Sequence, residues 1–157
     1  MRLLLLDRIT ELTPWESATG IKLVSASEDL LQHRDEGPGV LPPGLTLECA
    51  FQTAAWLIVI SSEMKLRPAI LTVRNVRWER EVVAGDRLET RVVMQTRSED
   101  AAEITGESFV DGERVLSLES GVCSLLGTAQ LDPPGAAEWM TGQLLRGLER
   151  VRGSGVG

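Results

Sequence analysis

The sequence predicts an α+β domain in which an antiparallel sheet wraps around one long buried helix. Residues 45–62 contain no internal proline or glycine and are apolar around most of the helix circumference, which indicates a buried helix. Residues 88–95 alternate between the two faces of a half-buried strand. The dipeptide at residues 111–112 is Asp-Gly, which a two-residue hairpin favours because both central residues need a positive φ. A helix followed by antiparallel strands is therefore expected.

The elements around that helix follow from local composition. Residues 3–12 and 17–24 have the composition of strands with turn chemistry between them, so the chain should open with a β-hairpin. Residues 25–44 are polar and rich in glycine and proline, which predicts a long loop, and long loops in compact domains are often functional. After the helix we expect four strands, at residues 70–80, 88–95, 103–110 and 114–126.

The last part of the chain is predicted to lie outside the sheet. Asp-Pro-Pro-Gly at residues 132–135 ends the sheet region, and residues 136–151 place apolar side chains at roughly helical spacing before a Gly-Ser-Gly tail. We therefore expect one domain over residues 1–131, followed by a C-terminal helix and flexible tail over residues 132–157. That helix would cap the domain or contact a partner.

Composition narrows the classes of function. The chain has 157 residues, of which 43% are hydrophobic, enough for one substantial core but not for two full domains. Its net charge of -7 works against binding to nucleic acid. Cys49 and Cys123 have neither CxxC spacing nor the density of a disulfide framework, so we expect a reduced, cytoplasmic protein. The apolar run at residues 1–6 is too short for a signal peptide, and residues 50–60 are too short for a membrane span.

His33 and Glu48 are the residues best suited to chemistry. His33 is the only histidine and lies in the long loop, fifteen residues before Glu48, which sits where the loop runs into the helix. An imidazole and a carboxylate at such a junction can perform proton transfer. One histidine and two distant cysteines do not form a typical ligand set, so we expect no metal site.

Three segments carry a resemblance to a known family. Residues 32–52 have the sequence QHRDEGPGVLPPGLTLECAFQ, residues 76–88 have VRWEREVVAGDRL, and residues 110–115 have VDGERV. They are similar to the motifs GHFPxxPIxPGVLxxEAxAQ, VxFxRPVVPGDxL and VDGxxV of the hotdog-fold (3R)-hydroxyacyl-[acyl carrier protein] dehydratases. The resemblance extends over most of the chain, and the altered loop indicates a specialised or divergent member.

The resemblance implies a hotdog fold and a homodimer, or a multiple of dimers, with two composite sites. In that family the loop histidine and the helix glutamate face each other across the dimer interface, which makes His33 and Glu48 the expected catalytic residues. Gly44, Pro43 and Gln52 are the expected substrate-binding residues. The implied partner is a 3-hydroxyacyl thioester on acyl carrier protein or coenzyme A, in fatty-acid-like or polyketide-like metabolism. No cofactor, nucleic acid or membrane is implied.

Dehydration of such a thioester needs a base, an acid and hydrogen-bond donors for the developing enolate oxygen. Histidine suits the base, and a glutamate can protonate the departing hydroxyl or hold water. Free N–H groups at a helix N-terminus can serve as the donors. Arg74, Arg77 and Arg80 are candidates to contact the phosphates of phosphopantetheine or coenzyme A, although charged strand residues are more often simply solvated.

The loop departs from the family pattern, because one more residue separates His33 from Glu48. With the alignment anchored on Glu48, Pro43 takes the place of the turn glycine whose N–H helps to hold the thioester carbonyl. With the alignment anchored on Pro43 and Gly44, the glycine is restored but the carboxylate is rotated by about 100° around the helix. Both alignments are compatible with the sequence.

Two other functions fit the same fold. A thioesterase would use Glu48 to activate water or to attack the carbonyl, with His33 secondary. A non-catalytic acyl-binding subunit would keep the dimer and the tunnel without the chemistry, and the charged pair Arg34-Asp35 after the histidine favours it somewhat. Without the resemblance, His33 would be interpreted as a solvated loop residue and Glu48 as a complement to the helix dipole.

Overall fold

The computed structural model describes residues 4–130, 135–146 and 148 of the chain. Its elements occur in the order β1 Arg8–Thr13, β2 Ser17–Leu23, β3 Val40–Leu41, α1 Pro43–Ser61, β4 Leu66–Trp78, β5 Val82–Val83, β6 Arg87–Arg97, β7 Ala101–Val110, β8 Glu113–Gly127, a 3-10 turn at Thr128–Gln130, and α2 Ala136–Leu144.

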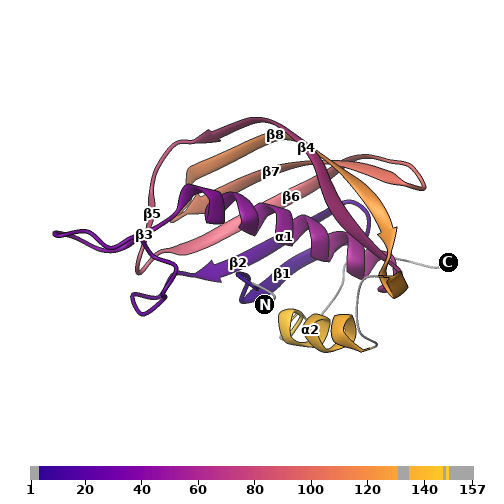
Figure 1. Cartoon of the computed structure of the whole chain (residues 1–157), viewed down its shortest axis with the longest axis horizontal. Coiled ribbons are helices and arrows are strands. Elements are labelled where there is room, and N and C mark those ends of the chain that lie inside the picture. Colours follow the sequence, from indigo (N-terminus) through magenta and orange to yellow (C-terminus); the bar gives the residue numbers. More distant parts are fainter. Residues whose placement is uncertain (1–3, 131–134, 147, 149–157) are drawn as a thin grey trace.

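A six-stranded antiparallel sheet, in the order β1-β2-β6-β7-β8-β4, curves around α1 (Figure 1). The long helix crosses the inner face of the sheet, and β1 and β4 form its two edges. The predicted α+β architecture, with a hairpin first and four long strands after the helix, is confirmed. The Asp-Gly hairpin is confirmed as well, because Asp111 and Gly112 both have positive φ between β7 and β8.

The buried position of α1 explains its composition. By length and a mean hydropathy of 1.4 the helix has the character of a membrane span, but half of that stretch is buried inside the fold. Its contact with β2 is especially close, since a Cβ added at Gly20 would lie 2.5 Å from the Oγ1 atom of Thr53. The sheet is the apolar partner of this helix, and glycine leaves room in β2 for the side chain of Thr53.

The first strand begins later than the sequence predicts. Residues 3–12 were expected to form it, but β1 starts at Arg8. Leu5 and Leu6 are buried without joining the sheet. The backbone N–H of Leu5 donates a hydrogen bond of 2.9 Å to the side chain of Gln52 on α1. An apolar run of this length has the composition of a strand, and only the contact with the helix distinguishes it.

Two short strands lie within segments that were expected to be irregular. β3 and β5 pair antiparallel, with Val40 opposite Val83 and Leu41 opposite Val82. Two-residue strands are too short to produce a periodic pattern in sequence. Together they fasten the end of the long loop next to the start of α1.

The C-terminal helix α2 packs against α1 and β1, at the bottom of Figure 1. Met140 and Leu144 are buried in the main hydrophobic core, which places α2 as a cap on the domain. The helix was predicted to extend over residues 136–151 but ends at Leu144. The predicted boundary between residues 131 and 132 lies outside the described residues and stays a prediction.

Candidate functional site

Glu48 is held by a short chain of hydrogen bonds on α1. Its Oε1 atom accepts a bond of 3.1 Å from the side-chain amide of Gln52, one turn further along the helix. The amide oxygen of Gln52 accepts the bond from the Leu5 N–H, so the orientation of the amide is set by the backbone. Gln52 therefore does two things at once: it satisfies a backbone donor and it positions the glutamate carboxylate.

A cavity of about 260 Å³ opens beside this carboxylate, and we call it the Glu48 pocket. It combines three polar side chains with an apolar remainder. Its lining residues are Leu4, Glu48, Gln52, Ala55, Trp56, Val59, Arg67 and Met140. His33 is not among them, so the two predicted catalytic residues do not share this pocket within one chain.

His33 is exposed and lies in the irregular segment that leads into β3. The loop is closed at its base by two backbone hydrogen bonds between Gln32 and Val40, of 2.8 and 2.9 Å. Arg34, the next residue, forms an exposed ion pair with Glu81. The histidine is therefore presented outward rather than packed against its own helix.

A second cavity, of about 370 Å³, lies at the N-terminus of α1 beside the base of this loop. Pro43 and Gln32 are among its lining residues. The carbonyl of Pro43 accepts a 2.9 Å hydrogen bond from the indole of Trp78, which ties the helix start to β4. Pro43 is the first helical residue and has no N–H, so Gly44 supplies the first donor of the helix.

The base of the long loop is fastened by an ion pair that was not anticipated from the sequence. Lys22 is only 5% exposed, and its Nζ atom lies 2.9 Å from Oε1 of Glu28. The same carboxylate accepts a hydrogen bond of 3.0 Å from the Ser25 N–H. Burial opposes ionisation of Glu28, but these two partners outweigh it and lower the pKa of the carboxyl. The one charged residue in the strand at residues 17–24 was the available signal, because a buried charge requires a partner.

Cys49 follows Glu48 but is fully buried against the sheet. Burial, above all, raises the pKa of this thiol to about 12, while the charge of Lys22 acts in the opposite direction. The thiol is therefore protonated near neutral pH and is a poor nucleophile. Cys49 is therefore a residue of the hydrophobic core.

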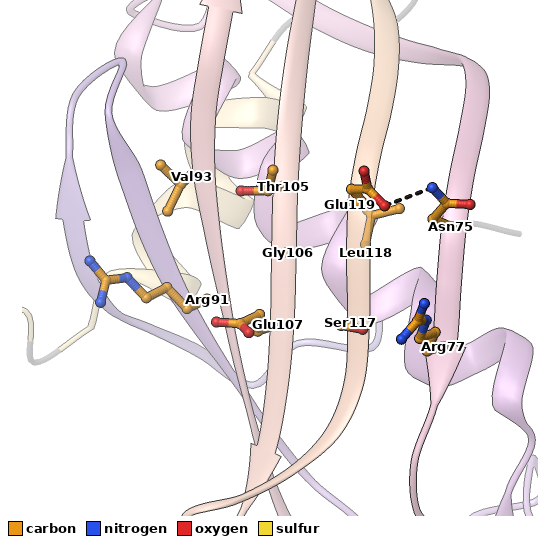
Figure 2. A pocket seen from close by; sticks show the side chains of 10 residues that line it. All are labelled: Asn75, Arg77, Arg91, Val93, Thr105, Gly106, Glu107, Ser117, Leu118 and Glu119. Carbon is orange, nitrogen blue, oxygen red and sulfur yellow. Dashed lines mark hydrogen bonds between the residues drawn. The ribbon is translucent and has the colours of Figure 1, made fainter.

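The three arginines proposed to contact phosphates do not converge. Arg77 lines a cavity of about 590 Å³ on the outer face of the sheet, away from α1. Figure 2 shows Arg77 and Arg91 on opposite sides of that cavity, with Glu107 and Ser117 between them. Arg74 is exposed on β4. A phosphate contact stays a prediction for Arg74 and Arg77.

Arg80 is already engaged by two carboxylates. Its guanidinium lies 3.1 Å from Asp86 and 3.1 Å from Glu113. These partners raise its pKa, the hydrogen bond to Glu113 most of all. Any phosphate bound by Arg80 would have to compete with both, so the contact proposed for it also stays a prediction.

The two edges of the sheet differ in what they present to solvent. β1 has six residues and a bulge between Ile9 and Glu11. β4 has thirteen residues, and it exposes the apolar side chains of Ile70, Leu71 and Val73. A long apolar edge strand is a ready template for pairing with another chain.

A comparison with models of protein families shows to which family this chain belongs. The model of the FabA-like domain matches residues 1–119. The chain belongs to the FabA-like family. A relative from Bacillus velezensis, described as 3-hydroxyacyl-[acyl-carrier-protein] dehydratase FabZ, is 36% identical over 118 residues, which cover 74% of this chain and 83% of the relative. A relative with the same description from Jannaschia sp. is 30% identical over 144 residues, 85% of this chain and 84% of the relative.

Solved structures confirm the hotdog fold expected of a FabA-like protein. The PaaI protein of the Escherichia coli phenylacetic acid degradation operon superposes with a TM-score of 0.60 at 14% identity, over 74% of this chain and 81% of its own. A hypothetical thioesterase from Streptococcus pneumoniae, solved with coenzyme A, superposes with a TM-score of 0.56 at 12% identity, over 76% and 85% of the two chains. At these identities the likeness concerns the fold. The matched FabA-like segment ends before α2.

Proposed function

We propose that this chain is a cytoplasmic dehydratase, or hydratase in the reverse direction, acting on 3-hydroxyacyl thioesters carried by acyl carrier protein or coenzyme A. The observation that carries the proposal is the position of Glu48. Its carboxylate is oriented by Gln52 at the mouth of a largely apolar pocket, inside the segment that matches the FabA-like family. The FabZ relatives are dehydratases by description, and they cover most of the chain.

In the proposed reaction His33 removes the proton beside the thioester carbonyl, and the hydroxyl group leaves with a proton from Glu48. The products are the enoyl thioester and water, so no oxidant or cofactor is consumed. The N–H of Gly44, at the start of α1, is a suitable donor for the developing enolate oxygen. Pro43 cannot take that role because it lacks an N–H.

We also propose that two copies of the chain form the working enzyme. His33 projects outward from its own chain, whereas Glu48 lines a pocket without it. A second copy that pairs along the exposed edge of β4 would bury Ile70, Leu71 and Val73. Such a two-fold assembly can bring the histidine of one copy to the glutamate of the other.

The direct test incubates the purified protein with a 3-hydroxyacyl thioester and with the matching enoyl thioester. Enoyl absorbance and free thiol are recorded together. Interconversion of the two thioesters without thiol release supports the dehydratase. Release of thiol would support the thioesterase, and turnover of neither substrate would support the non-catalytic acyl-binding subunit.

The composite site is tested by combining two inactive chains. His33→Ala and Glu48→Gln chains are produced together with different tags, and the heterodimer is isolated. Because one of its two sites keeps both residues, the heterodimer should recover about half of the wild-type activity. Each variant alone serves as the inactive control. A heterodimer that stays inactive would overturn the composite site.

A further inference from the structure

The Glu48 pocket runs along one face of α1. Glu48, Gln52, Ala55 and Val59 are spaced by four, three and four residues, which places them in a single stripe on the helix. Along the helix, the polar residues Glu48 and Gln52 precede the apolar residues Ala55 and Val59. These four side chains therefore span about 16 Å of the helix axis, with the Glu48 carboxylate at one end and the apolar Val59 at the other.

Met140 of α2 lines the same pocket from outside α1. Its side chain is 7% exposed and belongs to the main core. The helix that carries it is anchored by Leu144, which is 1% exposed, and by a 2.7 Å hydrogen bond from the guanidinium of Arg8 to the carbonyl of Arg146. Met140 is thus a fixed wall rather than a loose surface side chain.

The size of the Glu48 pocket limits what it accepts. Its volume of about 260 Å³ lies below the range of about 300–1,000 Å³ that is typical of small-molecule pockets. Besides the charged side chains of Glu48 and Arg67, the pocket is lined by Gln52 and by five apolar residues, Leu4, Ala55, Trp56, Val59 and Met140. The chemical group that fits is a short aliphatic chain attached to a polar reacting centre.

We propose that Met140 closes the apolar end of the Glu48 pocket and restricts the enzyme to short acyl chains. The inference rests on the proposed dehydratase function, and it concerns a helix outside the segment that the FabA-like model matches. Met140 acts as a specificity-determining residue, and the proton transfers belong to other side chains. Shortening it extends the pocket for additional methylene groups of the substrate.

The test compares 3-hydroxybutyryl and 3-hydroxydecanoyl thioesters of coenzyme A as substrates of the full chain. We measure the ratio of kcat/KM for the long substrate to that for the short one. The wild type should favour the short substrate, and Met140→Ala should raise the ratio by about tenfold or more, the effect expected when methylene groups gain room in an apolar pocket. Trp139→Ala is the matched control, because Trp139 is on the same helix but is 67% exposed, and its ratio should equal the wild-type ratio.

Met140→Phe provides the opposite change if Met140→Ala lowers the melting temperature too far for assay. The larger ring should lower activity on any acyl chain beyond butyryl while turnover of the butyryl substrate is retained. A wild-type preference for the long substrate, or an unchanged ratio in both Met140 variants, would overturn this inference. Absence of turnover on every substrate, including the shortest, would instead overturn the proposed function.

Discussion

The two proposed catalytic residues lie in contrasting surroundings. Glu48 is on a helix that crosses the core, and its carboxylate is oriented through Gln52 and the Leu5 backbone. His33 is on an exposed loop that is fastened at its base by the Gln32–Val40 backbone pair and the Lys22–Glu28 ion pair, and next to the histidine only by an exposed ion pair of Arg34. One chain therefore fixes its carboxylate without help but leaves its imidazole without a packed environment. The difference explains why the working site should need a second copy.

The largest expected effect separates activity from stability. His33→Ala should lower kcat by about 10²–10⁴, the usual contribution of a general base. The free energy of unfolding should change by less than about 0.5 kcal/mol, because the side chain is exposed. Enzyme assay and thermal unfolding of the same preparation test both parts. A large loss of stability would show that the loop is packed more tightly than described.

A substitution in β2, beneath α1, should mainly change stability rather than activity. In Gly20→Ala the new Cβ would lie 2.5 Å from Thr53, so either the helix or the strand must shift. We expect a loss of about 1–3 kcal/mol in the free energy of unfolding, as for other overpacked cores. Chemical denaturation measures it. Gly142→Ala is the control, since a Cβ there meets nothing within 4 Å.

The protein should also become less stable at alkaline pH, because of Cys49 on α1. The folded pKa of Cys49, about 12, exceeds the ordinary value of 9.0 for a thiol, so above pH 9 the unfolded chain ionises first. The free energy of unfolding should then fall with rising pH, by at most about 1.4 kcal/mol per pH unit. Cys49→Ala should reduce that slope between pH 9 and 11 while costing stability at every pH through the cavity it leaves. An equal slope in both proteins would exclude Cys49 as the source.

The smallest expected effect concerns the Lys22–Glu28 ion pair at the base of the loop, and it depends on acidic pH. The folded pKa of Glu28 is lowered from 4.5, so its stabilising contribution is present above pH 4.5 and is lost as pH falls through the folded value. Glu28→Gln should lower the melting temperature at pH 6, and this effect should shrink as the pH falls below 4.5. It should also reduce kcat severalfold, because the loop that carries His33 is less well fastened. Glu36→Gln, on the exposed part of the same loop, should change neither quantity.

The elements that repeat a pattern over many residues could be predicted from sequence, and the details that depend on a single contact could not. The helix and the long strands have clear periods, and the Asp-Gly turn has a steric cause. The late start of β1 depends on one hydrogen bond to Gln52, and the two-residue strands have no period at all. His33 and Glu48 were singled out by composition, but their separation within one chain required coordinates. Met140 lies in a segment whose helical spacing gave no sign of which pocket it would face.

The inequality of the sheet edges has a consequence for assembly. The β4 edge has thirteen residues and exposes the apolar side chains of Ile70, Leu71 and Val73, while the β1 edge has six residues and contacts α2; each of the two edge strands has a bulge. Two copies that pair through β4 use the same surface on each copy. Both surfaces are therefore buried in the dimer. In the proposed dimer, the exposed apolar edge of β4 is covered in both copies and cannot pair with a third chain.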